Sequence, residues 1–335
     1  MEEKLKKVIL TLLVIVTHFF ANDGYGALGA GGIIIGKTDD IAMAKEVLEI
    51  SYNKIKVSYE FINESDKDIT ETIVFPLPEF QIGVGIFSDH DSYLKMIDSF
   101  KVVVDGKPVT FETKVRTVIS GGELKGQDIT DKLLKLGFSE RDIIASEDNF
   151  DDIIVPKAEI LEKNGLCERN VENDEVYVRW TNHITYEWRQ TFKAHQKVKI
   201  SHEYRPLIGG GFSYSYHCSD SYDQDMLSEL CMPKQGLKAL KDYCLRYYDS
   251  FKTNDYLNRI EVSYILKTAN TWKDGIRDFK LIIQKKPHEV VSSCFPAPLR
   301  QTTAYTYGTE LKNFKPEEDL KIYFINIFWD DVESN

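Results

Sequence analysis

The segment from Phe212 to Asp225 carries the side chains best suited to binding chemistry. Its aromatic and imidazole groups could line a pocket for a sugar or a peptide, and its closely spaced carboxylates could hold Ca²⁺. The candidate ligand-binding residues are Tyr214, Tyr216, His217 and Tyr222, and the candidate calcium ligands are Asp220, Asp223 and Asp225. The segment has no glycine-bearing twelve-residue calcium loop, so a surface loop tethered by a disulfide is the alternative interpretation.

Four histidines stand in or near the same region. They are His183, His195, His202 and His217. A general base or a metal site needs such groups to converge and needs a carboxylate that orients them. Isolated histidines on strands are usually structural, so we expect no catalytic residues. The alternative is a hydrolase that acts on a glycan or a peptide through residues 183–225.

The chain has five cysteines, which are Cys167, Cys218, Cys231, Cys244 and Cys294. In an exported protein they meet oxidising conditions, so we expect disulfides among Cys218, Cys231, Cys244 and Cys294, with Cys167 left free. Sequence alone leaves the pairing open. Zinc is an alternative, because His217 adjoins Cys218, but the thirteen-residue spacings do not form the tight knuckle of structural zinc sites.

Two motifs near the start of the chain compete. Val8 to Phe20 is an apolar stretch behind a mildly basic head, and Ala21 precedes a polar turn, which predicts a signal peptide over residues 1–21. Gly31 to Thr38 matches the phosphate-binding pattern GxxxxGK[ST]. Its three consecutive isoleucines are β-branched and favour an extended strand over a loop that wraps phosphates. We therefore expect export to the periplasm or the medium, and no nucleotide site.

Composition limits the partners. The 335 residues are 42% hydrophobic, which is typical of a globular protein, and the net charge is −11. An acidic surface repels phosphate backbones, so nucleic acid is excluded as a partner class. After the first segment no stretch is long and apolar enough to span a bilayer, so we expect no transmembrane anchor in the cleaved protein.

The apolar pattern predicts strands that must position these groups. Residues 54–61 alternate with the period of a half-buried strand, Pro76 and Pro78 end a second strand, and Asp105-Gly106 marks a hairpin turn. Helical spacing replaces this pattern near 121–173. We expect a mainly β protein, an antiparallel β-sandwich with α-helical insertions. Residues 22–211 form an N-terminal β region and 212–335 a C-terminal α+β region, separate or packed as one unit, with Trp180, Trp188 and Trp272 in the core.

Several motifs along the chain resemble an uncharacterised bacterial family, the domain of unknown function 4424. They include Leu28-Gly-Ala-Gly-Gly32, Lys37-Thr-Asp-Asp-Ile41, Ser65-Asp-Lys-Asp68, Phe75-Pro-Leu-Pro78, Val104-Asp-Gly-Lys-Pro-Val109, Trp188-Arg-Gln-Thr-Phe192, His202-Glu-Tyr-Arg-Pro206 and Tyr264-Ile-Leu-Lys-Thr268. The resemblance implies an exported protein and no assigned activity. Together with the residues, it favours a non-catalytic binding or envelope-interaction protein whose partner is a protein, peptide or glycan of the cell envelope.

Overall fold

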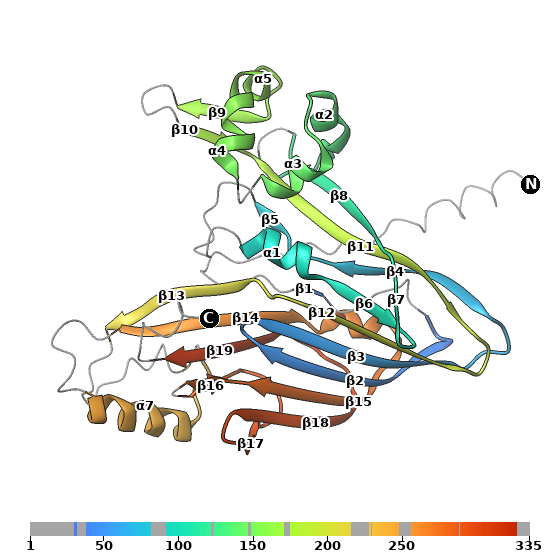
Figure 1. Ribbon diagram of the computed structural model, residues 1–335, viewed down its shortest axis with the longest axis vertical. Helices are drawn as coiled ribbons and strands as arrows, with labels where there is room; N and C mark the ends of the chain where they lie inside the picture. The colour runs from blue at the N-terminus through green and yellow to red at the C-terminus, as the bar shows by residue number, and fades with distance from the viewer. Residues whose placement is uncertain are drawn as a thin grey trace, which may run out of the picture.

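The computed structural model shows a mainly β protein made of antiparallel sheets with a few helices, which confirms the predicted fold class (Figure 1). The structure describes residues 30–31, 38–81, 92–121, 124–146, 149–170, 175–215, 228, 230–247, 256–287 and 289–326. The predicted signal peptide and residues 32–37 of the GxxxxGK[ST] match lie outside this set.

An eight-stranded sheet forms one layer of the sandwich, in the order β17-β18-β15-β2-β3-β12-β6-β7. Its strands are β2 (Ile41–Ser51), β3 (Lys54–Asn63), β6 (Lys101–Val104), β7 (Lys107–Pro108), β12 (Lys197–Tyr204), β15 (Lys273–Gln284), β17 (Arg300–Thr303) and β18 (Thr306–Phe314). Neighbouring strands are antiparallel except β15 and β2, which are parallel.

The alternation in β3 explains how this sheet divides the chain between core and solvent. Ile55, Val57, Tyr59 and Phe61 are buried on the inner face. Across the outer face, charged side chains form cross-strand pairs, such as Lys197 with Glu60 at 2.6 Å. The sheet therefore buries one apolar face and leaves a charged face to solvent.

Two smaller sheets cover the inner face. The five-stranded sheet consists of β1 (Ala30–Gly31), β13 (Ile208–Ser215), β14 (Tyr256–Ile265), β16 (Val290–Ser292) and β19 (Leu320–Asn326). The four-stranded sheet consists of β4 (Ile69–Pro76), β5 (Phe80–Gln81), β8 (Glu112–Ile119) and β11 (Trp180–Phe192). Ring contacts join the layers, as between Phe61 and Phe192, and the three tryptophans named above are buried in this core as predicted.

The predicted helical insertion follows β8 and projects from the sandwich (Figure 1). It contains α2 (Thr130–Lys135), α3 (Glu140–Ala145), α4 (Phe150–Ile153), η1 (Val155–Lys157), α5 (Ala158–Lys163) and the hairpin β9 (Cys167–Asn170) and β10 (Glu175–Val178). Asn182 of β11 is fully buried, accepts a hydrogen bond from Thr117 and donates to the Ile143 carbonyl. Through this amide the insertion is fixed to the four-stranded sheet.

Three further helical segments are α1 (Ser92–Ser99), α7 (Lys234–Tyr247) and η3 (Lys267–Thr271). The Asp105-Gly106 turn is present, with φ of 47° and 79°, but its second strand is only β7. The expected partner segment continues as β8 in the four-stranded sheet. The glycines Gly209, Gly210 and Gly211 lie inside β13 and pair with β14. None of the described helices is long and apolar enough to cross a membrane.

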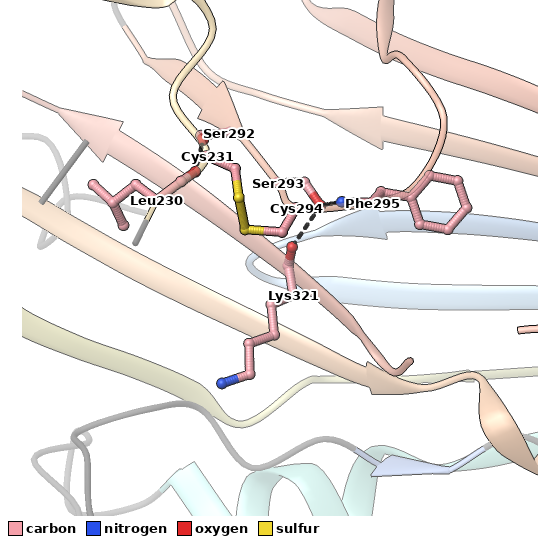
Figure 2. The surroundings of a disulfide bond; sticks show 7 residues. All are labelled: Leu230, Cys231, Ser292, Ser293, Cys294, Phe295 and Lys321. Carbon is pink, nitrogen blue, oxygen red and sulfur yellow. Dashed lines mark hydrogen bonds between the residues drawn. A yellow bond between two sulfur atoms is a disulfide. The ribbon is translucent and has the colours of Figure 1, made fainter. Parts of the chain in front are cut away.

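A disulfide joins Cys231, just before α7, to Cys294, just after β16 (Figure 2). The Ser292 hydroxyl donates to the Leu230 carbonyl beside it. Cys167 is a buried free thiol, as expected. Of the other two predicted disulfide residues, Cys218 lies outside the described residues, and only the backbone of Cys244 is described, within α7.

Candidate binding groove

A groove of about 560 Å³ lies beside the hairpin of β17 and β18 at one edge of the eight-stranded sheet. Its volume is within the range of ligand sites in proteins. The lining comes from β15, β17 and β18 and from the segment that leads into β17: Lys280, Leu281, Ile282, Ala297, Pro298, Arg300, Thr302, Thr306, Tyr307, Gly308, Thr309, Glu310 and Leu311. The groove is thus lined by strands whose register is fixed by pairing.

The local sequence explains the hairpin. β-branched threonines flank the turn at Ala304 and Tyr305, and the Tyr305 carbonyl accepts a hydrogen bond from the Lys285 amide. Thr302 sits where the pairing of β17 shifts register, and its hydroxyl donates to the Thr306 carbonyl at 3.2 Å. A Cβ at Gly308 would lie 2.9 Å from the Leu281 carbonyl oxygen, so only glycine allows the two strands to approach this closely here.

Of the three charged residues in the groove lining, two form an ion pair with each other and the third does not. Lys280 pairs with Glu310 at 2.8 Å, as their opposite positions in β15 and β18 dictate. This contact lowers the pKa of the Glu310 carboxyl and raises that of the Lys280 ammonium. Arg300 is exposed and makes no ion pair with any residue that the structure describes. One positive charge therefore remains available to a ligand, on a chain whose net charge is −11.

The sequence reasoning did not find this groove. The region lacks histidine, cysteine and tryptophan, and its alternation is weak because β18 carries charged or polar side chains at most positions. The signal that could have found it is the pair Pro298 and the threonine-rich stretch that follows. A proline, which cannot donate to a strand ladder, followed by the β-branched residues of a hairpin predicts the edge of a sheet.

The site predicted around Phe212 to Asp225 falls almost wholly outside the described residues. Tyr214 belongs to β13, where only its backbone is described. The residues outside the description are Tyr216, His217, Asp220, Tyr222, Asp223 and Asp225. Among the described residues, no three His, Cys, Asp or Glu side chains form a group that could hold a metal ion. The calcium site stays a prediction.

The described histidines do not converge. His183 on β11 contacts Glu79 at 3.0 Å, which lowers the pKa of that carboxyl. His195, in the turn between β11 and β12, contacts Asp66 at 2.8 Å at the surface. His202 is buried, and neither of its ring nitrogens has a hydrogen-bond partner among the described residues. Burial alone lowers its pKa to about 3, so the imidazole is neutral.

A second buried titratable group lies between the eight-stranded and five-stranded sheets. Glu46 of β2 is 2% exposed, and burial raises its pKa to about 8. The Tyr264 hydroxyl donates to it at 3.4 Å and lies 2.8 Å from the Tyr59 hydroxyl. The space beside these three groups has no room for water, so they are packing partners of the core and do not form a ligand site.

Comparison with known families decides what the chain is related to. The model of the family described as "Domain of unknown function (DUF4424)" matches residues 21–323. The chain belongs to this family. This match confirms the family resemblance that the sequence motifs indicated, and it covers most of the DUF4424 chain. The match begins at the last residue of the predicted signal peptide.

No curated protein matches this DUF4424 chain. Among solved structures it is similar to one described as a "putative nutrient binding protein" from Legionella pneumophila, at 17% identity and a TM-score of 0.40. That match covers 89% of this chain and 71% of the other. A likeness at this level carries no functional argument.

Proposed function

We propose that this protein is an exported binding protein of the cell envelope that holds its ligand, without chemical conversion, in the groove beside β17 and β18. The observation that supports this is the groove itself, about 560 Å³, with an exposed arginine whose charge no described residue neutralises. Charged and hydroxyl groups around a concave surface fix the orientation of a ligand. Export is supported by the apolar stretch before Ala21 and by the disulfide between Cys231 and Cys294.

A thermal-shift screen of the mature chain tests the groove. The compounds are amino acids, short peptides, oligosaccharides and peptidoglycan fragments, because the proposed ligand belongs to the envelope. A ligand at a hundred times its Kd stabilises the folded state by about 2.7 kcal/mol, which is measurable as a higher Tm.

Two tryptophan variants locate the binding. Thr302→Trp fills the groove, while Thr72→Trp places the same side chain at an exposed position of β4 in the four-stranded sheet. We expect the ligand-induced rise in Tm to disappear in Thr302→Trp and to persist in Thr72→Trp. If no compound raises the Tm of the wild type, or if both variants respond as the wild type does, the groove is not the binding site.

The hydrolase alternative has one structural observation in its favour, the contact between His183 and Glu79. A carboxylate that orients an imidazole is part of many general-base sites. The His183→Gln variant separates the two functions, since it removes the imidazole and leaves the groove untouched. Ligand turnover that depends on His183 would replace binding by hydrolysis as the function.

A further inference from the structure

At one edge of the eight-stranded sheet, β18 is paired on both sides over its first residues and on one side only over the rest. β15 pairs with β18 from Thr306 to Phe314, whereas β17 covers only Thr306 to Gly308. Beyond that point, along Thr309 to Lys312, no described strand lies on the other side of β18. An open edge presents backbone N–H and C=O groups at alternate residues, which is the arrangement that an added strand needs.

The sequence explains why the edge is left open at this place. Pro298 has no N–H to donate to a ladder, so β17 does not extend further along β18 and begins at Arg300. Ala297 and Pro298 then form part of the groove lining. At the other end, Asn313 has φ of 52° and interrupts the pairing with β15. The open interval is four residues, about 14 Å at about 3.4 Å per residue.

The opposite edge of the same sheet is closed in the usual way. β7 has two residues and ends at Pro108. Short edge strands and prolines prevent the addition of a foreign strand. Lys312 is a charged residue of the kind that also protects edges, but its ammonium pairs with Asp278 of β15 at 2.8 Å, over the outer face of the sheet. The β18 edge therefore lacks the protection that the β7 edge has.

The charge in the groove indicates which strand would fit. Arg300 is the first residue of β17 and pairs with Gly308, next to the open interval of β18, and it belongs to the groove lining. Because Lys280 is matched by Glu310, Arg300 is the charge in the groove lining that an incoming carboxylate can neutralise. An arginine binds a carboxylate through two parallel hydrogen bonds, which adds specificity to the backbone pairing.

We propose that β18 accepts an extended acidic segment of a partner protein as an added strand along Thr309 to Lys312, with one carboxylate of that segment bound to Arg300. This proposal rests on the proposed binding function and names the class of ligand for the same groove. Backbone hydrogen bonds supply affinity, and the side chain at Arg300 selects the acidic residue.

A peptide selection on the full mature chain tests this. A display library of random seven-residue peptides is the probe, and the selected peptides are synthesised for affinity measurements. We expect them to share an acidic residue and to bind about ten-fold more weakly to Arg300→Glu, an effect of about 1.4 kcal/mol. The control is Lys107→Glu, which makes the same charge reversal at the closed β7 edge and leaves affinity unchanged.

Two further measurements report on the backbone. Peptides with N-methyl groups at alternate residues cannot pair with a strand edge, so one of the two methylation patterns should abolish binding. Hydrogen exchange of the amides from Thr309 to Lys312 should slow when the unmethylated peptide is bound. Equal binding of both methylated patterns, or equal affinity for wild type and Arg300→Glu, would overturn the proposal.

The experiments distinguish a failure of this proposal from a failure of the proposed binding function. If the selected peptides ignore Arg300 but a small molecule still loses its effect in Thr302→Trp, the groove binds another class of ligand. If neither peptides nor small molecules respond to Thr302→Trp, both proposals are wrong. Protection of the Thr309 to Lys312 amides that appears with rising protein concentration, without peptide, would identify a second copy of the chain as the occupant and overturn the partner segment.

Discussion

Beneath the five-stranded sheet, Glu46 is enclosed with the hydroxyls of Tyr59 and Tyr264, whereas beneath the four-stranded sheet His202 lies among aromatic rings such as those of Phe75 and Phe100. Both groups are fully buried and both are held in their neutral forms. Tyr59 links the two regions, because its ring lies 5.6 Å from that of His202. The same cause, burial, thus raises the pKa of the acid and lowers that of the base.

The two regions have opposite effects on stability as pH changes. Between about pH 4.5 and 8 the unfolded Glu46 loses its proton while the folded one keeps it, so stability falls as pH rises. Between about pH 6.5 and 3 the unfolded His202 gains a proton that the folded one does not bind, so stability falls as pH decreases. For these two groups, stability is greatest between about pH 4.5 and 6.5.

The largest effect is expected from Glu46→Gln, which keeps a polar group beside Tyr264 and cannot ionise. At pH 9 the variant should be more stable than the wild type by roughly 5 kcal/mol, and at pH 4 the two should be nearly equal. Urea denaturation at a series of pH values measures this. Glu49→Gln on the same strand is the control, since Glu49 pairs with Lys56 on the solvent side. An equal pH profile for both variants would show that Glu46 is not neutral in the folded state.

Next in size is the disulfide, which links parts of the chain that belong to the five-stranded half. Cys294→Ser opens a link across 63 residues, and the chain-entropy relation gives a loss of about 4 kcal/mol. Denaturation of the variant, compared with the oxidised wild type, measures the loss, and the reduced wild type should resemble the variant. Cys167→Ser is the control, because that thiol is free. A Cys294→Ser variant as stable as the oxidised wild type would contradict the expectation.

A smaller effect is expected from His202→Phe, which continues the ring cluster of Phe75, Phe100 and Tyr204. Removing two buried nitrogens without partners should stabilise the protein by about 1 to 3 kcal/mol at pH 7. The loss of stability between pH 6 and 4 should also diminish. His195→Phe is the matched control at the surface. If the stability of His202→Phe falls between pH 6 and 4 as steeply as that of the wild type, groups other than His202 cause this fall.

The smallest effect is expected from Tyr59→Phe, which removes the hydroxyl between the two regions and keeps the ring. The loss of the hydrogen bond to Tyr264 should cost about 1 kcal/mol. Thermal denaturation of this variant against Tyr52→Phe, whose ring packs on Phe324, measures it. Equal Tm values for the two variants would mean that the Tyr59 hydroxyl contributes no more to stability than the Tyr52 hydroxyl does.

The sequence predicted the strands whose alternation is strong. The pattern at Ile55 to Phe61 became β3, and the proline at 76 ended β4 as expected. Local patterns cannot show which strands become neighbours: β15 pairs with β2 across more than two hundred positions, and the segment after Val109 leaves its hairpin for another sheet. Pairing depends on the packing of the whole core, which no short window contains.

Glu46, His202 and the groove could not be foreseen for related reasons. Glu46 alternates with charged neighbours such as Lys45 and Glu49, and only the register shift between Met43 and Lys45 turns it inward. His202 was considered as one of several histidines, and nothing in the sequence separates it from His183 or His195. The groove depends on where β17 stops, which is a property of a sheet edge that two distant segments share.

The bond between Cys231 and Cys294 encloses both β14 and β15, which belong to different layers of the sandwich. Both cysteines lie beside β16 of the five-stranded sheet, so the closed loop passes to the eight-stranded sheet through η3 and returns between β15 and β16. In the half that contains His202 the chain passes between the layers from β3 to β4, from β7 to β8 and from β11 to β12, and no disulfide among the described residues closes these passages into a loop. A single cut of the backbone between β14 and β15 would therefore leave both pieces of the chain covalently attached for as long as the disulfide is oxidised.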